Sequence, residues 1–385
     1  MTEESKEWSS KFNPFNSDKL LSQLPRWKGI KEWKEGNGNL PAPTTISIDP
    51  ANICDISCKG CNAEFIMQRN NNIMTKDTLI EIADFLPTWG DSNYKVETVC
   101  IGGGGESLLN PYTKDFIQKL KENGIQSGIV TNGTQINKNL EALCDCEWVG
   151  VSIDAGTPET YIEVKGADKF DKVVENIELL IKESKRKNST LNLPGNGHGV
   201  SWKYLLRPET IDEIYIAAKI AKEIGCRNMH IRPIAPSWDK INGATDVFNE
   251  HDIYNFREQL KKARKLEDEN FGVYGITHKF NGDFTPSYDF NKCNAIYMSA
   301  VIMPPTDKDK GIFDITTCCD NRGNNLLTQK NMASVEQIRN YWGSKEHREL
   351  IDKIDVSKCT RCTFSPHQKI YENAIEINNM TYNFI

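Results

Sequence analysis

The chain has 385 residues, which is too long for one average domain, so two or three domains are expected. Its formal net charge of −6 argues against a nucleic-acid-binding protein, because such proteins usually carry a basic domain or stripe. The chain has no run of about 18 apolar residues and its amino terminus lacks the regions of a signal peptide, so we expect no membrane span and a cytoplasmic protein.

The first 43 residues show no clear hydrophobic period. They carry Trp8, Trp27 and Trp33 among several prolines. We expect residues 1–43 to be an N-terminal extension that packs on the domain after it.

From residue 44 to residue 235, short apolar runs alternate with amphipathic stretches, which predicts an α/β fold with a parallel sheet. The predicted strands lie near 45–50, 98–102, 127–131, 148–154, 200–206 and 228–234. A bridging segment, 236–292, is expected to contain one helix at roughly 250–267 and an irregular tail rich in Phe, Tyr and Pro. Residues 293–385 are expected to form a second, smaller α+β domain.

Three cysteines lie within eight residues directly after the first predicted strand, in the run Cys54-Asp-Ile-Ser-Cys58-Lys-Gly-Cys61. Three thiolates leave a four-iron cluster with one iron lacking a protein ligand, whereas clusters that only carry electrons are normally closed by four cysteines. A structural zinc site is the alternative, although it prefers four ligands and no fourth Cys or His is near in sequence. Twelve cysteines without a signal peptide favour metal clusters in a reducing cytoplasm over disulfides.

A second polar motif follows the next predicted strand, where an apolar run ends in four glycines and Glu106. Glycines at a strand end let the backbone approach a ligand closely, because no Cβ intervenes. Two later strands also end in polar groups, Thr131 with Asn132 and Ser152 with Asp154. The carboxyl ends of parallel strands are where α/β barrels place ligand contacts, although turn chemistry and helix capping explain such residues equally well.

The spacing of the cysteine triplet, together with these motifs in order, resembles the radical S-adenosylmethionine (radical SAM) superfamily. The resemblance implies a partial (β/α)6 barrel and a [4Fe–4S] cluster held by Cys54, Cys58 and Cys61. It also implies S-adenosylmethionine (SAM) contacts from the following residues: Gly104, Gly105 and Glu106 at the amino group, and Thr131, Asn132, Ser152 and Asp154 around the ribose and carboxylate. Ser107 stands where the family usually has proline.

The C-terminal part holds further cysteines that could close a cluster or a zinc site: Cys293, Cys318, Cys319, Cys359 and Cys362. This part resembles the SPASM/Twitch extension of radical SAM enzymes. The full SPASM form needs about seven ligand cysteines, so the shorter Twitch form with one auxiliary [4Fe–4S] cluster fits better. We expect Cys293, Cys318, Cys359 and Cys362 to be the ligands, with Cys319 as the alternative to Cys318.

The resemblance implies cleavage of SAM to a 5′-deoxyadenosyl radical that abstracts hydrogen from a substrate, with flavodoxin or ferredoxin as the kind of electron donor. We expect a small polar metabolite as substrate and net oxidation through the auxiliary cluster. Arg207 and Arg232, at the ends of the fifth and sixth predicted strands, could bind a substrate carboxylate or phosphate, or could instead pair with barrel carboxylates or with SAM. Two alternatives are a peptide-modifying radical SAM enzyme and a non-catalytic iron–sulfur or zinc protein.

Overall fold

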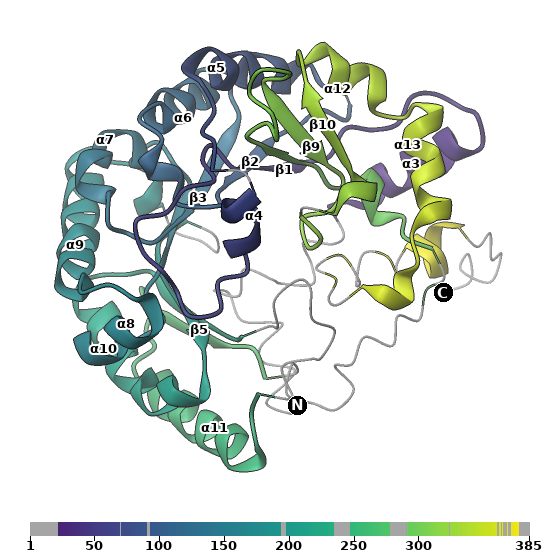
Figure 1. Ribbon diagram of the computed structural model, residues 1–385. Coiled ribbons are helices and arrows are strands. Elements are labelled where there is room, and N and C mark those ends of the chain that lie inside the picture. Colours follow the sequence, from purple (N-terminus) through teal and green to yellow (C-terminus); the bar gives the residue numbers. More distant parts are fainter. Residues whose placement is uncertain are drawn as a thin grey trace.

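A computed structural model gives the structure of the chain (Figure 1). It describes residues 22–69, 71–90, 93–193, 198–234, 247–277, 290, 292–322, 324–359, 362, 364, 368 and 371–376. Trp8 and most of the predicted extension lie outside these residues. None of the helices in the described ranges is long and apolar enough to cross a membrane.

One curved sheet of ten strands organises the molecule, in the order β10-β9-β8-β1-β2-β3-β4-β5-β6-β7. The strands are β1 (Thr45–Ile48), β2 (Thr98–Ile101), β3 (Gln126–Thr131), β4 (Trp148–Ser152), β5 (Gly199–Leu206), β6 (Asn228–Pro233), β7 (Gly272–Gly275), β8 (Val301–Met303), β9 (Phe313–Thr316) and β10 (Thr328–Met332). Strands β1 to β7 are parallel neighbours in chain order, which is the topology that repeated βα units give.

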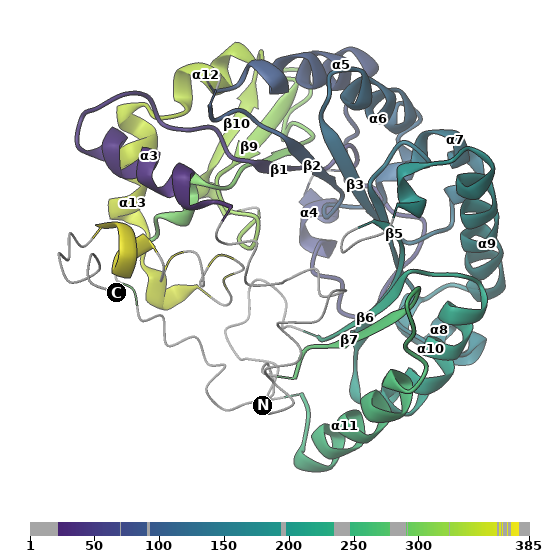
Figure 2. The same ribbon diagram turned by 180° about the vertical axis from the view of Figure 1, so that it is seen from behind.

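Helices cover the convex side of this sheet in an arc, which both ribbon views show (Figures 1 and 2). The helices of the barrel part are α4 (Glu64–Arg69), α5 (Lys76–Phe85), α6 (Thr113–Glu122), α7 (Leu140–Leu143), α8 (Pro158–Lys165), α9 (Phe170–Arg186), α10 (Ile214–Glu223) and α11 (Glu250–Arg264). Only α4, which follows the cysteine triplet, lies on the concave side in the view of Figure 1.

Strand residues alternate between two environments. Val149, Val151, Trp202 and Tyr204 are buried in the core between sheet and helices. Because successive side chains of a strand point to opposite faces, the residues between them point to the concave side, here called the inner face. The inner face of β5 therefore carries Lys203.

The C-terminal part continues the same sheet. Strand β8 pairs in parallel with β1, and β9 and β10 follow as antiparallel neighbours. Helices α12 (Glu336–Tyr341) and α13 (Lys345–Lys353) complete this region, and residues 371–376 form a π-helical turn. The open edge at β1 is thus covered by strands that come from the far end of the sequence, and the predicted smaller domain has no separate sheet in the described residues.

The six predicted strands correspond to β1 to β6, and the helix predicted at 250–267 is α11. The bridging segment differs from the prediction, because Gly272–Gly275 is a seventh parallel strand paired with β6. This four-residue strand begins and ends in glycine, so its sequence lacks the pattern of a strand. The remainder of the predicted irregular tail, 278–289, is outside the described residues.

The described end of the N-terminal extension is helix α3 (Leu24–Lys34), which begins with proline near its first turn. Trp27 packs against Tyr371 with ring centroids 4.9 Å apart, and Trp33 packs against Tyr297 at 5.1 Å. Arg26 donates to Glu97 at 2.9 Å, just before β2. The helix therefore joins the barrel part to the C-terminal part instead of packing on the barrel alone.

Candidate functional site

The cysteine triplet lies on the loop that follows β1, and all three thiols are partly exposed. The loop is fixed to the end of α8, where Ser57 N donates to Lys165 O at 3.2 Å and Lys59 N donates to Val164 O at 3.0 Å. The contact requires glycine at position 166, where φ is 63° and a Cβ would lie 2.5 Å from Ser57 O. We call residues 54–61 the cluster loop.

The three thiols of the cluster loop lie close enough to influence one another. Burial raises the pKa of Cys58 to about 11, and negative charge on Cys61 and Cys54 adds to the rise while Lys165 opposes it. Burial also raises the pKa of Cys54, with a further contribution from Glu106. Thiols with raised pKa values bind metal only with loss of their protons, so cluster binding here would be coupled to proton release.

Asp55 ties the cluster loop to the segment after β3. Its carboxylate accepts hydrogen bonds from Asn132 Nδ2 and Thr134 Oγ1, both at 2.8 Å, and from Lys169 Nζ at 3.1 Å. Burial by itself would raise the pKa of Asp55, but these donors lower it to about 2. No sequence pattern indicated this role, because an aspartate between two cysteines is ordinary in a polar loop.

The glycines after β2 pack directly on the chain that leads into the cluster loop. A Cβ at Gly105 would lie 2.5 Å from Ile53 O, and a Cβ at Gly104 would lie 2.4 Å from Asn52 Oδ1. Residues 102–105, here called the glycine strap, can approach this closely only because they lack side chains. The amide of Asn52 is buried and has no partner in the described residues, which is the kind of polar group that a bound ligand would satisfy.

Glu106, at the end of the glycine strap, is buried and holds the following strand end in place. Its carboxylate accepts from Thr131 Oγ1 at 2.8 Å, from Asn132 N at 2.6 Å and from Leu108 N at 3.0 Å. Burial raises the pKa of Glu106 to about 7 although these hydrogen bonds oppose the rise. Thr131 and Asn132 therefore lie beside Glu106, and both donate a hydrogen bond to its carboxylate.

Asp154 lies beyond the end of β4 with φ at 63°, in the left-handed region that aspartate tolerates better than most residues. Its carboxylate accepts from Leu205 N at 2.7 Å and from Lys165 Nζ, in an ion pair that is almost fully buried. Burial would lower the pKa of Lys165, but Asp154 and Cys58 together raise it above its ordinary value. Lys165 was missed by sequence reasoning, since a lysine at a helix end is common and gave no signal. Ser152, two residues earlier, lies on the inner face.

The two arginines that were candidates for substrate binding lie in different surroundings. Arg207 is buried and donates to Lys59 O, so it braces the cluster loop. Arg232 is exposed at the end of β6 and lies on the inner face, because its neighbours Ile231 and Pro233 are buried on the other side. Of these two arginines, only Arg232 is therefore exposed enough to contact a substrate.

The C-terminal cysteines come together from three separate segments. Burial raises the pKa of Cys359 to about 11, with further contributions from Cys293 and Asp320. Burial also raises the pKa values of Cys318 and Cys362, and Cys293 and Asp320 contribute at both. Cys293 thus interacts with three thiols that are 25 or more residues away in sequence. Asp320 is a buried acidic neighbour of this group that the sequence analysis did not single out.

One buried ion pair connects this second group to the glycine strap. Arg322, four residues after Cys318, donates from Nη1 to both carboxylate oxygens of Asp49 at 2.8 Å. Asp49 follows β1 and is fully buried. The guanidinium also passes over the strap, because a Cβ at Gly103 would lie 1.7 Å from Arg322 Nη1.

Across the described ranges, no three His, Cys, Asp or Glu side chains converge closely enough to hold a single metal ion. In the structure, the thiols of each of the two cysteine groups lie near one another, and we propose that each group binds a cluster. Three thiols on one loop, beside a glycine strap and an unpartnered buried amide, nevertheless fit a cluster with one open iron and a polar ligand lying on it.

The family model of the radical SAM superfamily matches residues 48–205, which include the cluster loop, the glycine strap and β5 as far as Leu205. The chain carries a radical SAM domain. A probable GTP 3′,8-cyclase of Saccharolobus islandicus is 21% identical over 233 residues, which is 59% of this chain and 68% of that protein. A S-adenosylmethionine-dependent nucleotide dehydratase of Flammeovirga pacifica is 28% identical over 126 residues, which is 31% of this chain and 40% of that protein.

Solved structures share the fold of the radical SAM domain and of the region after it. Streptococcus suis SuiB bound to S-adenosylmethionine aligns with a TM-score of 0.56 and 16% identity, over 86% of this chain and 70% of that one. Native anSMEcpe with bound AdoMet and a Kp18Cys peptide aligns with a TM-score of 0.55 and 15% identity, over 85% of this chain and 88% of that one. The predicted α/β fold with a parallel-sheet partial barrel is confirmed.

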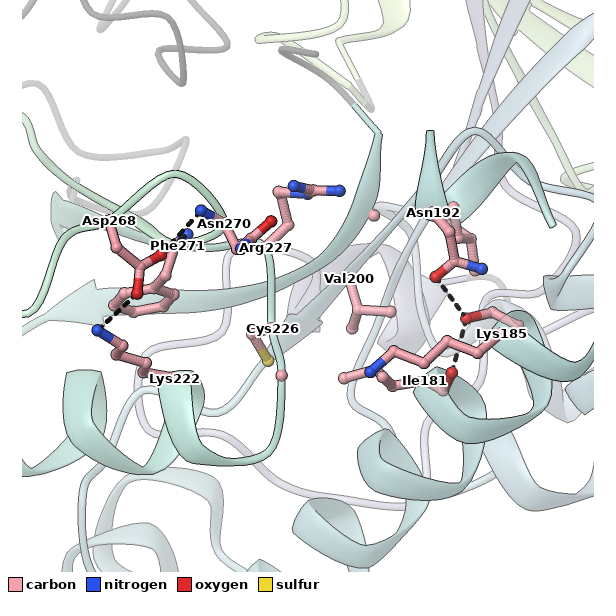
Figure 3. A pocket seen from close by; sticks show the side chains of 14 residues that line it. Ile181, Lys185, Asn192, Val200, Lys222, Cys226, Arg227, Asp268, Asn270 and Phe271 are labelled. Carbon is pink, nitrogen blue, oxygen red and sulfur yellow. Dashed lines mark hydrogen bonds and ion pairs between the residues drawn. The ribbon is translucent and has the colours of Figure 1, made fainter. Parts of the chain in front are cut away.

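A separate cavity of about 490 Å³ lies next to the first residues of β5 and β6, at the end of the sheet opposite to the cluster loop (Figure 3). Its basic side chains include Lys222, whose ammonium pairs with Asp268 at 2.7 Å. The lining residues Gly199 and Arg227 stand at the amino ends of strands, whereas the cluster loop and glycine strap follow carboxyl ends. This cavity is therefore remote from the cysteines and is not part of the candidate site.

Proposed function

We propose that this protein is a radical SAM enzyme whose Cys54, Cys58 and Cys61 hold a [4Fe–4S] cluster, with SAM lying against the glycine strap. When bound, the cluster and SAM supply a one-electron cleavage of the S–C5′ bond, which gives methionine and a 5′-deoxyadenosyl radical. The observation that carries the proposal is the docking of Gly104 and Gly105 on the chain before Cys54, which brings strap and cysteines to one point.

The protein's own residues position these parts. Asp55 and Arg207 fix the cluster loop from two sides, through the segment after β3 and through Lys59 O respectively. Glu106, whose carboxyl group follows the strap directly, is proposed to contact the amino group of SAM. Thr131, Asn132, Ser152 and Asp154 are proposed to surround its ribose and carboxylate, as the resemblance implies.

The direct test is anaerobic reconstitution followed by reduction with dithionite in the presence of SAM. We expect iron and sulfide to bind and 5′-deoxyadenosine to form. The triple variant C54A/C58A/C61A should lose both, while the variant Cys144→Ala, at a buried cysteine far along the chain, should keep both. A reconstituted wild-type protein that forms no 5′-deoxyadenosine, or that holds zinc at the triplet, would reject the proposal.

We further propose an auxiliary [4Fe–4S] cluster held by Cys293, Cys318, Cys359 and Cys362, with Cys319 as the alternative to Cys318. Proximity of Cys293 to the other three thiols supports this ligand set. Such a cluster could accept an electron from the substrate radical, which would make the net reaction an oxidation. Replacing Cys359 and Cys362 by Ala should lower iron to about four atoms per chain while SAM cleavage persists.

The first candidate substrate is a small polar metabolite, which the likeness to a probable GTP 3′,8-cyclase and a nucleotide dehydratase supports. The second candidate is a peptide, because the structures of SuiB with the precursor peptide SuiA and of anSMEcpe with a Kp18Cys peptide cover most of this chain. Stimulation of SAM cleavage by candidate compounds distinguishes them. A flavodoxin or ferredoxin in a reducing compartment such as the cytoplasm is the proposed electron source.

A further inference from the structure

Lys203 occupies the middle of β5 on the inner face of the sheet. Its sequence neighbours Trp202 and Tyr204 are buried on the helix side, so its own side chain points to the concave side. In register, Lys203 lies beside Ser152 on β4 and beside His230 on β6. The lysine is therefore part of the wall that faces the region in front of the cluster loop.

Two glycines on neighbouring strands make room for this side chain. The indole of Trp148 crosses Gly128, where a Cβ would lie 2.1 Å from Trp148 Cε2. The stem of Lys203 crosses Gly150 in the same way, with a Cβ there 2.8 Å from Lys203 Cε. Its ammonium lies 5.7 Å from the centroid of the Trp148 ring, a cation–π distance. The aliphatic part of the Lys203 side chain therefore packs against the sheet, and only its ammonium can contact a ligand.

Among the described residues of this wall, no carboxylate pairs with the charge of Lys203. Within the part of the chain that the structure describes, no carboxylate is within ion-pair distance of its ammonium. Burial and the like charge of Arg232 lower the pKa of Lys203 to about 8, so the amine is still mainly protonated at neutral pH. The two acids after β1 and β4 already form ion pairs, Asp49 with Arg322 and Asp154 with Lys165.

A cation removed from water without an anion is unfavourable, and such a group is a ready site for a bound anion. Arg232 lies one strand away and two residues nearer the carboxyl end of the sheet, because its register partner is Leu205. Two cations on adjacent strands can hold one oxyanion, the lysine as a point charge and the arginine through its planar fork.

We propose that Lys203, assisted by Arg232, binds an anionic group of the substrate, a carboxylate or a phosphate, on the inner face of β5 and β6. The inference rests on the proposed function, since it assumes that the substrate lies in front of the SAM site. It narrows the substrate class to compounds with such a group, and a neutral sugar or cyclitol would leave the charge of Lys203 uncompensated.

Pyridoxal 5′-phosphate tests this proposal without relying on turnover, because its aldehyde condenses with an amine while its phosphate occupies an anion site. The reconstituted protein, with SAM bound, is treated with pyridoxal 5′-phosphate or with pyridoxal at equal concentration, reduced with borohydride and mapped by peptide mass spectrometry. We expect Lys203 to be labelled at least about tenfold faster by the phosphate-bearing reagent, because the guanidinium of Arg232 holds the phosphate beside the amine that forms the imine, and one charge-assisted hydrogen bond contributes about this factor. The exposed Lys172 should show no such preference.

Competing anions identify the source of the oxyanion. Protection of Lys203 by inorganic pyrophosphate indicates a phosphate-bearing substrate, and protection by succinate indicates a carboxylate. Protection by neither anion, or equal labelling by the two reagents, would overturn the proposal. Protection by SAM alone, relative to protein without it, would also overturn the proposal, because Lys203 would then belong to the SAM site.

Variants provide a second measurement by calorimetric titration of the anion that protects. Lys203→Gln should weaken its binding about tenfold, Lys203→Arg should largely retain it, and the control Lys172→Gln should not change it. Iron content and SAM affinity of the same variants show that they are folded. Formation of 5′-deoxyadenosine by the wild-type protein tests the proposed function separately, so normal SAM cleavage with no anion binding would reject only the present inference.

Discussion

The ion pair between Arg322 and Asp49 gives the sharpest prediction about how the two cysteine groups are joined. Both side chains are almost fully buried, and Arg322 Nη1 lies 2.8 Å from each carboxylate oxygen of Asp49. Replacing Arg322 by Met removes the cation and leaves the carboxylate of Asp49 buried without a counter-charge. Breaking a buried pair in this way typically lowers the free energy of unfolding by about 3–5 kcal/mol.

The matched control for Arg322→Met removes both charges. Replacing Asp49 by Asn and Arg322 by Gln together leaves two neutral groups that can bond to each other, so the double variant should recover most of the lost free energy. Arg322→Lys keeps the charge but loses the guanidinium contacts with Gly102 O, and should fall between the wild type and Arg322→Met.

Urea denaturation of the reconstituted proteins under anaerobic conditions measures these differences, with midpoints compared at equal iron content. SAM affinity is the second readout, because Arg322 crosses the glycine strap at Gly103 and its loss should loosen the strap. The reasoning would be refuted if Arg322→Met unfolded at the wild-type midpoint, or if the double variant were no more stable than the single one.

Three further predictions concern single sites. Gly105→Ala should abolish SAM binding, because its Cβ would lie 2.5 Å from Ile53 O. The control Gly124→Ala meets no atom within 4 Å and should lower the free energy of unfolding by only about 1 kcal/mol, because of its left-handed φ, with SAM binding retained. Equal effects of the two substitutions on SAM binding would contradict the steric argument. Asp55→Asn should lower the amount of iron that the reconstituted protein retains in the presence of a chelator, because the ion pair with Lys169 is lost, and Lys169→Met should have the same effect. If both variants retain as much iron as the wild type, other contacts hold the cluster loop in place. Burial lowers the pKa of His347 to about 3, from an ordinary 6.5 in the unfolded chain, so the unfolded state binds more protons between these two pH values. The free energy of unfolding should therefore fall by about 1.4 kcal/mol as the pH is lowered from well above 6.5 to 5.5. Urea titrations of the wild type and His347→Gln over this pH range measure the difference, and parallel curves would disprove it.

The behaviour expected of His347 follows from contacts that no sequence pattern shows. Its Nδ1 accepts from Gly343 N at 3.1 Å, and Nε2 lies 3.3 Å from Ile296 O, so the neutral ring satisfies both partners. The rings of Trp342 and Tyr341 pack on it with centroids 4.4 Å and 4.9 Å away. A protonated imidazole would lose the hydrogen bond from Gly343 as well as its hydration, which explains the direction of the pKa shift.

Much of the barrel and the first cysteine group could be predicted because the signals are local. The spacing of Cys54, Cys58 and Cys61, the glycine strap and the alternation of apolar runs with amphipathic stretches all lie within short windows of sequence. Strand boundaries within β1 to β6 agreed to within two residues with those predicted, since hydrophobic runs bounded by turn residues define them.

The tertiary structure alone decided the features that depend on long-range contact. Pairing of β8 with β1 closes the sheet edge with residues more than 250 positions away, and Asp49 meets Arg322 across 273 positions. Whether the ammonium of Lys203 can bind an anion depends on the glycines of two other strands, which make room for its stem, and on the acids that already form ion pairs elsewhere. Sequence pattern reports how a segment folds against its own neighbours, whereas the charge balance of a site depends on which distant side chains reach it.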